Sequence, residues 1–540
     1  MGALVMIEGR RALRLLDLMM TGIGGLVGSG WLFSSLTASN VAGPGAIISW
    51  VIGMAAIAII GLTFAELAGL VPEMGGVIRY PELSHGSLTS FLIGWAVLIS
   101  YAGLAPIEAE GVLQYASTYV PGLYNAGSST LTPAGFVIAT ALVISFFVLN
   151  YFGVKLYAKI NSNMTWIKLV VPALTAMLLL ASGFHTGNFT QHGGFLPAGW
   201  SGVFSAISTG GVIFTFTGFR TMFDMAGEAR NPRRDMSRAL FLALGFVGIL
   251  YVLLQLAFIG ALPGSDLSHG WAKVALTSPF ANLAMVLNMS WLAIILYADA
   301  IISPMGTGFV YAAAFPRSLF AFAKNGYFWP ALKRLNHYGT PGVAMGASIV
   351  VGILFLLPFP SWQKMVSILS SATILTYMIG PISAAALRKS APDAQRSYRV
   401  RGLGILGPIG FVVGSLIFYW SGWDINRWML GLLVLGALVY FAYGIRKMDR
   451  PMNDIKSGLW LLAYFAAMFL MERFGSANYG GTNLIPAPWD QAIVAAISMA
   501  FYYWGVAARK VLSQADQEAL SVSPAMEGLD HPEDAVRQLV

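Results

Sequence analysis

The chain has 540 residues, of which 57% are hydrophobic and only 10% are charged, and its mean hydropathy is +0.69. Soluble proteins have about 45–50% apolar and about 25% charged residues, so this composition excludes a soluble multidomain enzyme. The high apolar content excludes a disordered chain, and the lack of cysteine excludes a disulfide-stabilised scaffold. A net charge of +8 would fit nucleic-acid binding, so the positions of the basic residues decide that question.

Apolar runs dominate the chain from its beginning to its last thirty residues. A helix needs about 20 apolar residues to cross about 30 Å of hydrocarbon. Fourteen such runs predict fourteen membrane-spanning helices, at 14–37, 43–71, 90–120, 133–153, 161–182, 203–226, 238–262, 290–315, 342–358, 364–387, 404–422, 428–446, 457–474 and 487–508. The first run is too long for a signal peptide and lacks a small-residue cleavage site, so we expect it to stay in the protein.

The basic residues gather on one side of this predicted topology. When the N-terminus and every second loop are assigned to one side, that side holds 26 of the 32 lysine and arginine residues, and the other side holds 4. The remaining two, Lys168 and Arg220, fall inside apolar runs. Because cytoplasmic loops carry the excess of basic residues, both termini are predicted to be cytoplasmic. The positive charge is therefore a topology signal, and no nucleic-acid partner is predicted.

Two of the predicted helices contain a weak point inside the membrane. The first run has five glycines among residues 22–30, each of which weakens a helix by about 1 kcal/mol. The sixth run has a second weak point at 214–220. Breaks at Gly28 and Gly218, in the first helix of each of two five-helix halves, are typical of a secondary transporter's binding site, where free carbonyls and half-helix N-termini meet the substrate. For each helix alone, the glycines can instead form a close packing surface.

Four sequence blocks resemble the amino acid–polyamine–organocation superfamily. They occur in the family's order at 22–33, 64–76, 218–235 and 316–341. The resemblance implies an all-α integral membrane protein with the leucine-transporter fold, a five-plus-five inverted repeat that works by alternating access. It also implies amino-acid uptake driven by protons or by exchange. The repeats are expected at 1–182 and 183–390, four accessory helices at 391–510, and a polar, cytoplasmic, disordered tail at 511–540.

The same resemblance marks the residues of the binding site. The implied substrate-binding residues are Ile23, Gly28, Ser29, Gly30, Phe214, Phe216, Thr217, Gly218 and Arg220. The backbone of the first four would bind the substrate's α-carboxylate, and carbonyls near Ile23 and 214–217 would bind its α-amine. Phe214 or Phe216 would act as an aromatic gate. The chain departs from the family pattern at Trp31 and at Arg220, where the family often has isoleucine and glutamate.

Arg220 is the more informative departure, because a charge inside the membrane is costly. A guanidinium stays charged and presents a fork that matches a carboxylate. Arg220 would therefore repel cationic substrates and attract the side chain of aspartate or glutamate. Alternatively, Arg220 pairs with Asp224 at helical spacing i, i+4. The two readings are compatible, because a substrate could replace Asp224 as the partner.

Lys168 lies in the fifth run, where the resemblance implies the cation site of proton-coupled members. A buried lysine can gain and lose a proton at working pH, so its ammonium would stand in for sodium and bridge the first and eighth helices. Ser303 and Thr307 are the expected oxygen partners. Alternatively, Lys168 extends to the cytoplasmic interface and keeps its charge in water.

Several further polar residues fall inside predicted spans. Candidates for a proton relay or a gate are Tyr101, Glu108, Asp224 and Asp299. Glu108 and Glu110 are two residues apart, so at most one of them faces the pathway. Tyr101 can equally be a packing residue, and Glu66 is expected in an ion pair for gating or helix packing.

The motifs of other functional classes are not found in the sequence. The histidines are expected in loops or in the tail without ligand spacing, so no metal site is predicted. The chain has no nucleophile elbow and no phosphate-binding loop, so we expect neither an enzyme nor a bound cofactor.

The sequence therefore predicts a plasma-membrane amino-acid transporter, specifically a proton symporter that favours aspartate or glutamate. One alternative is an exchanger or a neutral amino-acid permease in which Asp224 holds Arg220. Another is a membrane sensor that kept the fold and lost transport, although only about thirty polar residues follow the last run. The lipid bilayer and the substrate are the expected partners, and the oligomeric state is left open.

Overall fold

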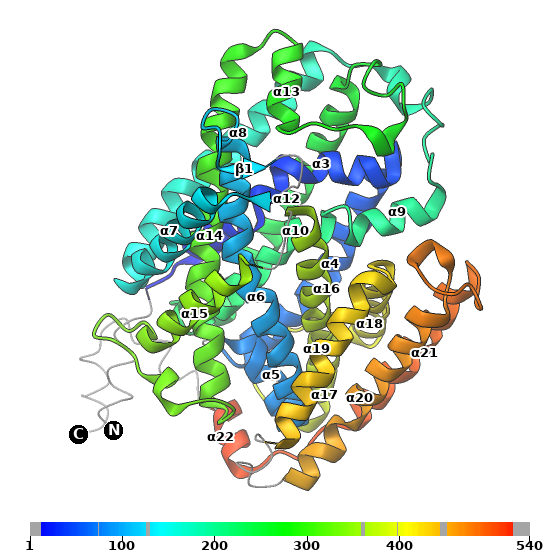
Figure 1. Cartoon of the computed structure of the whole chain (residues 1–540). Coiled ribbons are helices and arrows are strands. Elements are labelled where there is room, and N and C mark those ends of the chain that lie inside the picture. The colour runs from blue at the N-terminus through cyan, green and yellow to red at the C-terminus, as the bar shows by residue number, and fades with distance from the viewer. Residues whose placement is uncertain are drawn as a thin grey trace.

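A computed structural model of the chain describes residues 12–73, 75–125, 130–357, 362–396, 398–442 and 451–521. Helices form nearly all of this part (Figure 1). The two strands named in it, β1 (Tyr124–Asn125) and β2 (Thr130–Leu131), form a small antiparallel hairpin in which Tyr124 pairs with Leu131.

The first five apolar runs form six α-helices, and a seventh, α5, lies between the second and third runs. The helices are α2 (Leu15–Leu26), α3 (Ser29–Ala42), α4 (Ala46–Leu70), α5 (Gly76–His85), α6 (Ser87–Ala116), α7 (Pro133–Tyr151) and α8 (Val154–Ser182). Short 3-10 turns are η1 (Gly43–Gly45) and η2 (Thr186–Phe189). Because α2 and α3 share the first run, that run is interrupted inside the membrane.

The next five runs repeat this order of elements. The helices are α9 (Gly199–Ser208), α10 (Val212–Phe216), α11 (Arg220–Asp224), α12 (Pro232–Ala261), α13 (Pro279–Val286), α14 (Ser290–Lys324), α15 (Gly342–Phe355), α16 (Trp362–Tyr377) and α17 (Ile379–Ser390). The 3-10 turns are η3 (Thr217–Phe219), η4 (Ala226–Glu228), η5 (Trp271–Lys273) and η6 (Pro330–Lys333). Helices α6 and α14, which form the third run of each set of five, pack along each other (Figure 1).

The last four runs form a separate group of helices beside this core. They are α18 (Leu403–Trp420), α19 (Trp423–Ala442), α20 (Pro451–Phe474) and α21 (Trp489–Ala507), with η8 (Ala477–Tyr479) and a final helix α22 (Gln514–Ser521). Figure 1 shows α18 to α21 on one side of the molecule, next to α16 and α17. We call α18 to α21 the accessory helices.

The apolar pattern is confirmed as helical throughout the described part. Eleven helical segments there are long and apolar enough to cross a membrane, and the longest, Ser29–Leu70, contains parts of two predicted runs. Two shorter apolar helices, Leu15–Leu26 and Gly342–Phe355, match the first and ninth runs. The last run corresponds to α21. The chain is therefore a multi-pass membrane protein.

The sixth run differs from the prediction in where it is interrupted. The helix stops between Ser208 and Val212, where Gly211 has a φ of +88°. At Gly218 the chain only tightens into the 3-10 turn η3. The predicted break at Gly218 is therefore misplaced by several residues. Gly218 is needed for another reason: a Cβ there would lie 2.1 Å from the carbonyl group of Gly25, so the two helices touch backbone to backbone.

Two elements expected to be irregular are helical instead. His85 was predicted in a loop, but it ends α5, is buried, and its ring bonds Ser84 Oγ and the Gly505 carbonyl oxygen, both at 2.8 Å. In the predicted disordered tail, α22 begins after Ser513, whose hydroxyl accepts the backbone N–H of Asp516 at 3.2 Å. Asp516 in turn accepts the backbone N–H of Ser513, which completes a capping box. Residues 522–540 of the predicted tail lie outside the described residues.

Candidate functional site

The first interruption presents the N-terminus of α3 to the centre of the molecule. Helix α2 ends at Leu26 and α3 begins at Ser29, as the sequence predicted around Gly28. The backbone N–H of Ser29 donates to Glu108 Oε2 on α6 at 2.7 Å. A helix N-terminus attracts anions, and here the anion is the side chain of Glu108. The predicted α-carboxylate position is therefore occupied by a carboxylate of the protein itself.

The glycines of this break make room for that arrangement. A Cβ on Gly28 would lie 2.7 Å from Thr307 Oγ1 and 2.8 Å from Glu108 Oε1. A Cβ on Gly30 would lie 2.6 Å from Thr215 Cγ2. The carbonyl of Ile23 accepts the backbone N–H of Val27 at 2.9 Å, so it closes the end of α2. Of the two glutamates on α6, Glu108 hydrogen-bonds α3, whereas Oε2 of Glu110 has no hydrogen-bond partner among the described residues.

Lys168 reaches the first interruption from α8. Its side chain is 0% exposed, and Nζ donates to the Gly24 carbonyl oxygen and to Thr307 Oγ1, both at 2.5 Å. Thr307 Oγ1 also lies 2.7 Å from the Gly24 carbonyl oxygen and 2.9 Å from that of Val27. The ammonium therefore bridges α8 to α2 and α14. This geometry is contrary to the alternative in which Lys168 extends to the membrane surface.

Ser303, the second expected partner of Lys168, is used differently. It lies one turn before Thr307 on α14, and its hydroxyl donates to Asp299 Oδ2 at 2.8 Å. The other oxygen of Asp299 is buried and has no hydrogen-bond partner among the described residues. The structure thus brings Thr307 to Lys168 and pairs Ser303 with Asp299.

Arg220 lies on α11 and is 1% exposed. Its Nε donates to the Tyr101 hydroxyl at 3.2 Å, and NH1 donates to Thr376 Oγ1 at 2.5 Å. The guanidinium carbon also lies 4.3 Å from the centre of the Tyr101 ring. In the part of the chain that the structure describes, no carboxylate pairs with Arg220 within 4.0 Å. Its partners are a phenol, an alcohol and aromatic rings.

Asp224 is connected to Arg220 through Tyr101. The Tyr101 hydroxyl accepts from Arg220 and donates to Asp224 Oδ2. The other oxygen of Asp224 is buried without a hydrogen-bond partner among the described residues. The direct i, i+4 ion pair considered from the sequence is therefore replaced by a bridge through a neutral hydroxyl.

The two candidate gate phenylalanines lie in different surroundings. The Phe214 ring packs on Trp362 with ring centroids 5.7 Å apart, and Trp362 Nε1 donates to Ser29 Oγ at 2.9 Å. Phe216 packs on Trp50 and Tyr251, at 5.9 and 5.8 Å. Phe214 is thus the one beside the first interruption.

Helix α16 supplies contacts that the sequence did not reveal. Thr376 binds Arg220, and the Tyr377 hydroxyl donates to the Thr217 carbonyl, one of the carbonyls expected to bind the α-amine. Tyr311 of α14 donates to the Gly25 carbonyl oxygen at 3.0 Å. One sequence feature indicates such contacts: the apolar run that forms α16 contains the polar cluster Ser370-Ser371-Ala372-Thr373 and then Thr376-Tyr377.

Two ion pairs, one buried and one partly buried, hold helices together. Glu66 of α4 accepts from Arg388 Nε at 2.7 Å and from NH2 at 2.5 Å, as expected for a gating or packing pair. Arg317 of α14 binds Glu228 through Nε at 2.5 Å and NH2 at 3.0 Å. Both are bidentate arginine–carboxylate pairs, which fix the relative orientation of the two side chains as well as neutralising their charges.

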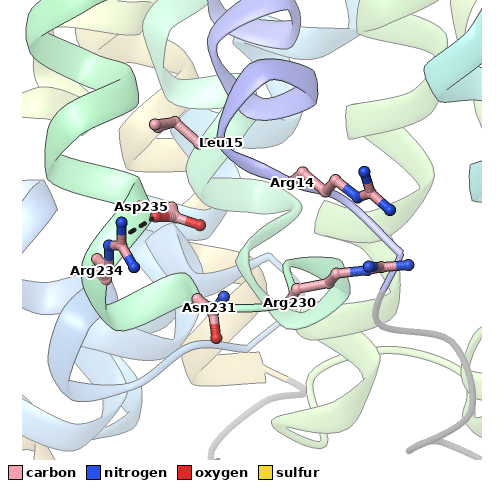
Figure 2. Close-up of a pocket in the computed structure, with 6 residues that line it drawn as sticks. All are labelled: Arg14, Leu15, Arg230, Asn231, Arg234 and Asp235. Atoms are coloured by element: carbon pink, nitrogen blue, oxygen red, sulfur yellow. Dashed lines mark ion pairs between the residues drawn. The ribbon is translucent and has the colours of Figure 1, made fainter. Parts of the chain in front are cut away.

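A pocket of about 300 Å³ lies at the beginning of α2 and of α12, lined by Arg14, Leu15, Arg230, Asn231, Arg234 and Asp235. Figure 2 shows Arg14 and Arg230 extending to the same side, while Arg234 lies 3.8 Å from Asp235. None of the predicted substrate-binding residues lines it, so the candidate site is the buried one around α2, α3 and α11.

Comparison with known proteins places the chain in a family. The sequence model described as "Amino acid permease" matches residues 13–469. The glutamate/serine transporter AimA of Bacillus subtilis is 40% identical over 499 residues, covering 91% of this chain and 92% of that protein. The aspartate-proton symporter of the same organism is 38% identical over 501 residues, covering 92% and 96%.

A more distant relative is also named as an amino-acid permease. The branched-chain amino acid permease BcaP of B. subtilis is 26% identical over 448 residues, covering 80% of this chain and 93% of that protein. The match to the family extends over most of the chain and includes every candidate site residue. The chain therefore belongs to the amino acid permease family, whose members are membrane transporters, not enzymes, and share the leucine-transporter fold predicted from the sequence.

Proposed function

We propose that this protein is a proton-coupled transporter of acidic amino acids in the plasma membrane, with both termini in the cytoplasm. The observation that carries the substrate class is Arg220, a buried guanidinium with neutral partners and no carboxylate paired with it in the described part. A buried charge without a directly paired carboxylate is costly, and the side-chain carboxylate of aspartate or glutamate would supply that direct partner. The names of the two relatives at 38–40% identity agree with this substrate class.

The backbone at the two weak points would bind the part of the substrate common to all amino acids. The α-carboxylate would take the N-terminus of α3 at Ser29 and displace Glu108 from that position. The α-amine would bind carbonyls near Ile23 and 214–217, where Tyr377 now donates to Thr217. Phe214, beside Trp362, would cover the bound substrate as the gate.

Proton coupling would use Lys168 with Thr307. A charged Lys168 ties α8 to the Gly24 carbonyl near the end of α2, where the resemblance to the superfamily implies a cation site. Loss of its proton would remove the charge that draws the Gly24 carbonyl toward α8. Tyr101, Glu108, Asp224 and Asp299 would serve as relay or gate groups, and Ser303 would hold Asp299.

The domain boundaries follow from the repeat. The first repeat would comprise 1–182, the second 183–390 and the accessory helices 391–510. Matched elements support this division, since α2 and α3 correspond in order to α9 to α11, and α6 corresponds to α14. The oligomeric state stays open.

A second candidate function is transport of neutral amino acids, alone or by exchange. The observation that favours it is that Tyr101 already links the Arg220 guanidinium to Asp224. In that case Arg220 would be a structural group, and substrate choice would depend on the space around Phe214.

Uptake into proteoliposomes separates these functions. Radiolabelled aspartate is offered with an inward pH gradient, an inward sodium gradient, both or neither, and then with competing glutamate, serine, alanine or arginine. The proposal expects accumulation that follows the pH gradient and competition chiefly by glutamate. Failure to accumulate aspartate, or competition by alanine but not by glutamate, would overturn the substrate class, and a sodium requirement without a pH response would overturn the coupling.

A further inference from the structure

A chain of buried hydrogen bonds runs from the accessory helices into the transport core. Glu472 of α20 accepts from Asn426 Nδ2 of α19 at 2.5 Å, and Asn426 Oδ1 accepts from Ser371 Oγ of α16 at 2.6 Å. All three side chains are at most 1% exposed. We call these three residues the accessory relay.

Hydrogen bonds fix the orientation of Asn426 in the accessory relay. Asn426 Nδ2 also donates to the Phe418 carbonyl oxygen at 2.6 Å, so both of its amide hydrogens and its carbonyl oxygen are engaged. Glu472 has no cationic partner within 4.0 Å among the described residues. An ionisable residue inside a membrane span is costly and by default has a role, yet none of the transport groups above contacts it.

Helix α16 connects the accessory relay to the residues around Arg220. Ser371 faces α19, while Thr373 bonds Ser100 of α6 at 2.5 Å. Less than a turn after Thr373, Thr376 accepts from Arg220. A helix moves as a stiff rod over so short a distance, so a shift at Ser371 displaces Thr376.

We propose that the accessory helices position α16 through the accessory relay, and thereby set how tightly the Arg220 subsite binds its substrate. Ser371, Asn426 and Glu472 are positioning residues, since they act through Thr376 and do not touch the substrate. The inference rests on the proposed function in one respect, because it takes Arg220 to be a substrate contact. It assigns the last four helices a share in substrate affinity.

Adjacent serines provide a matched pair for the test. Ser371→Ala removes the hydroxyl that donates to Asn426, whereas the buried Ser370 hydroxyl has no hydrogen-bond partner among the described residues. In proteoliposomes, we expect Ser371→Ala to raise the KM for aspartate by about threefold to tenfold with kcat little changed, as the loss of one buried hydrogen bond would do. Ser370→Ala should keep the KM of the wild type. Equal KM values for the two variants would overturn the inference.

A double-mutant cycle tests whether the effect passes through Thr376. Thr376→Ala removes the acceptor for Arg220, so adding Ser371→Ala to it should change the KM no further. Independent, multiplying effects of the two substitutions would overturn the inference. Glu472→Leu should raise the KM for aspartate. Glu472→Gln keeps a carbonyl oxygen that accepts from Asn426, so its KM should equal that of the wild type. If Ser371→Ala does not fold, this second pair of variants tests the inference.

Arg220→Gln, measured in the same assay, separates the two hypotheses. An unchanged aspartate KM in Arg220→Gln would overturn the proposed role of Arg220 in substrate binding. A raised KM in Arg220→Gln together with a wild-type KM in Ser371→Ala would overturn the accessory relay alone.

Discussion

The two cations buried in the membrane, Lys168 and Arg220, have different surroundings, and the difference separates their proposed tasks. Lys168 donates to a backbone carbonyl and an alcohol at a helix break. Arg220 lies on a helix after the second break and is held by a phenol, an alcohol and aromatic rings. A lysine can lose its proton and a guanidinium keeps its charge, so the first suits coupling and the second suits recognition of an anion.

Helix α2 brings the two regions next to each other. The Gly24 carbonyl accepts from Lys168, and the following carbonyl, that of Gly25, accepts from Tyr311 and packs against Gly218 just before Arg220. A change in the Lys168 contact therefore reaches the Arg220 region across one peptide unit and a backbone contact. This adjacency gives the coupling between proton and substrate a short physical path.

The largest expected effect is that of Lys168→Ala. This substitution removes the ammonium that ties α8 to α2 and α14, so accumulation driven by a pH gradient should fall to the background of empty liposomes. Exchange of external for internal substrate should persist, because it needs no net proton movement. The measurement is gradient-driven uptake compared with counterflow in the same preparation.

Lys168→Arg is the control for that prediction. It keeps the positive charge and the donors but does not release a proton, so it should fold and exchange while failing to respond to pH. A normal pH response in Lys168→Arg would contradict the coupling role of Lys168.

Arg220→Gln should reduce kcat/KM for aspartate by about 10- to 100-fold and leave that for asparagine nearly unchanged. The range corresponds to a lost charged hydrogen bond of about 1.5–3 kcal/mol, at about 1.4 kcal/mol per factor of ten. The quantity to measure is the ratio of kcat/KM for aspartate to kcat/KM for asparagine, obtained by letting the two amino acids compete for uptake. If Arg220 has only a structural role, both substrates lose transport equally.

Thr307→Val and Ser303→Ala form the next comparison. Thr307 contacts Lys168 and the end of α2, whereas Ser303 bonds Asp299. We therefore expect Thr307→Val to weaken pH-driven uptake by about tenfold, as the loss of a hydrogen bond to a charged group would, and Ser303→Ala to do so much less. Uptake at several external pH values provides the test. A larger defect in Ser303→Ala would reverse the assignment of the lysine's partners.

Tyr101→Phe should have the smallest effect of the four. It removes the hydroxyl between Arg220 and Asp224 but keeps the ring under the guanidinium. Asp224 would then compete directly with the substrate for Arg220, so the aspartate KM should rise by about threefold, a change of under 1 kcal/mol. Replacing Asp224 by Asn in the same protein should lower the KM again, and a failure of this second change would show that Asp224 does not compete.

Much of the fold could be predicted from the sequence, because membrane helices leave a strong apolar pattern. Each of the fourteen runs contains a helix within the described residues, and the break at Gly28 lies where its glycines indicated. The break in the sixth run was misplaced because a glycine can serve either a turn or a close contact. Gly211 adopts the left-handed conformation at the break, whereas Gly218 packs against the backbone of Gly25, where a Cβ would not fit.

Some contacts among the candidate site residues follow from the sequence, and others do not. Lys168 and Thr307 meet as expected, but nothing in the sequence distinguishes Glu108 from Glu110 as the residue that hydrogen-bonds α3. The position of Tyr101 between Arg220 and Asp224 depends on how α6 packs on α11, and so does not follow from helical spacing alone. The contacts of α16 do not follow from the sequence, because a polar cluster in a membrane helix does not reveal which neighbouring helix it faces or which residue it binds.

The central claim is that protons accompany an acidic amino acid through this protein. The direct measurement is the internal pH of proteoliposomes, followed with a trapped indicator while aspartate is added outside in the absence of sodium. The account predicts that aspartate acidifies the interior with wild-type protein, that alanine does so much less, and that Lys168→Ala abolishes the signal. Entry of labelled aspartate without acidification of the interior would contradict it.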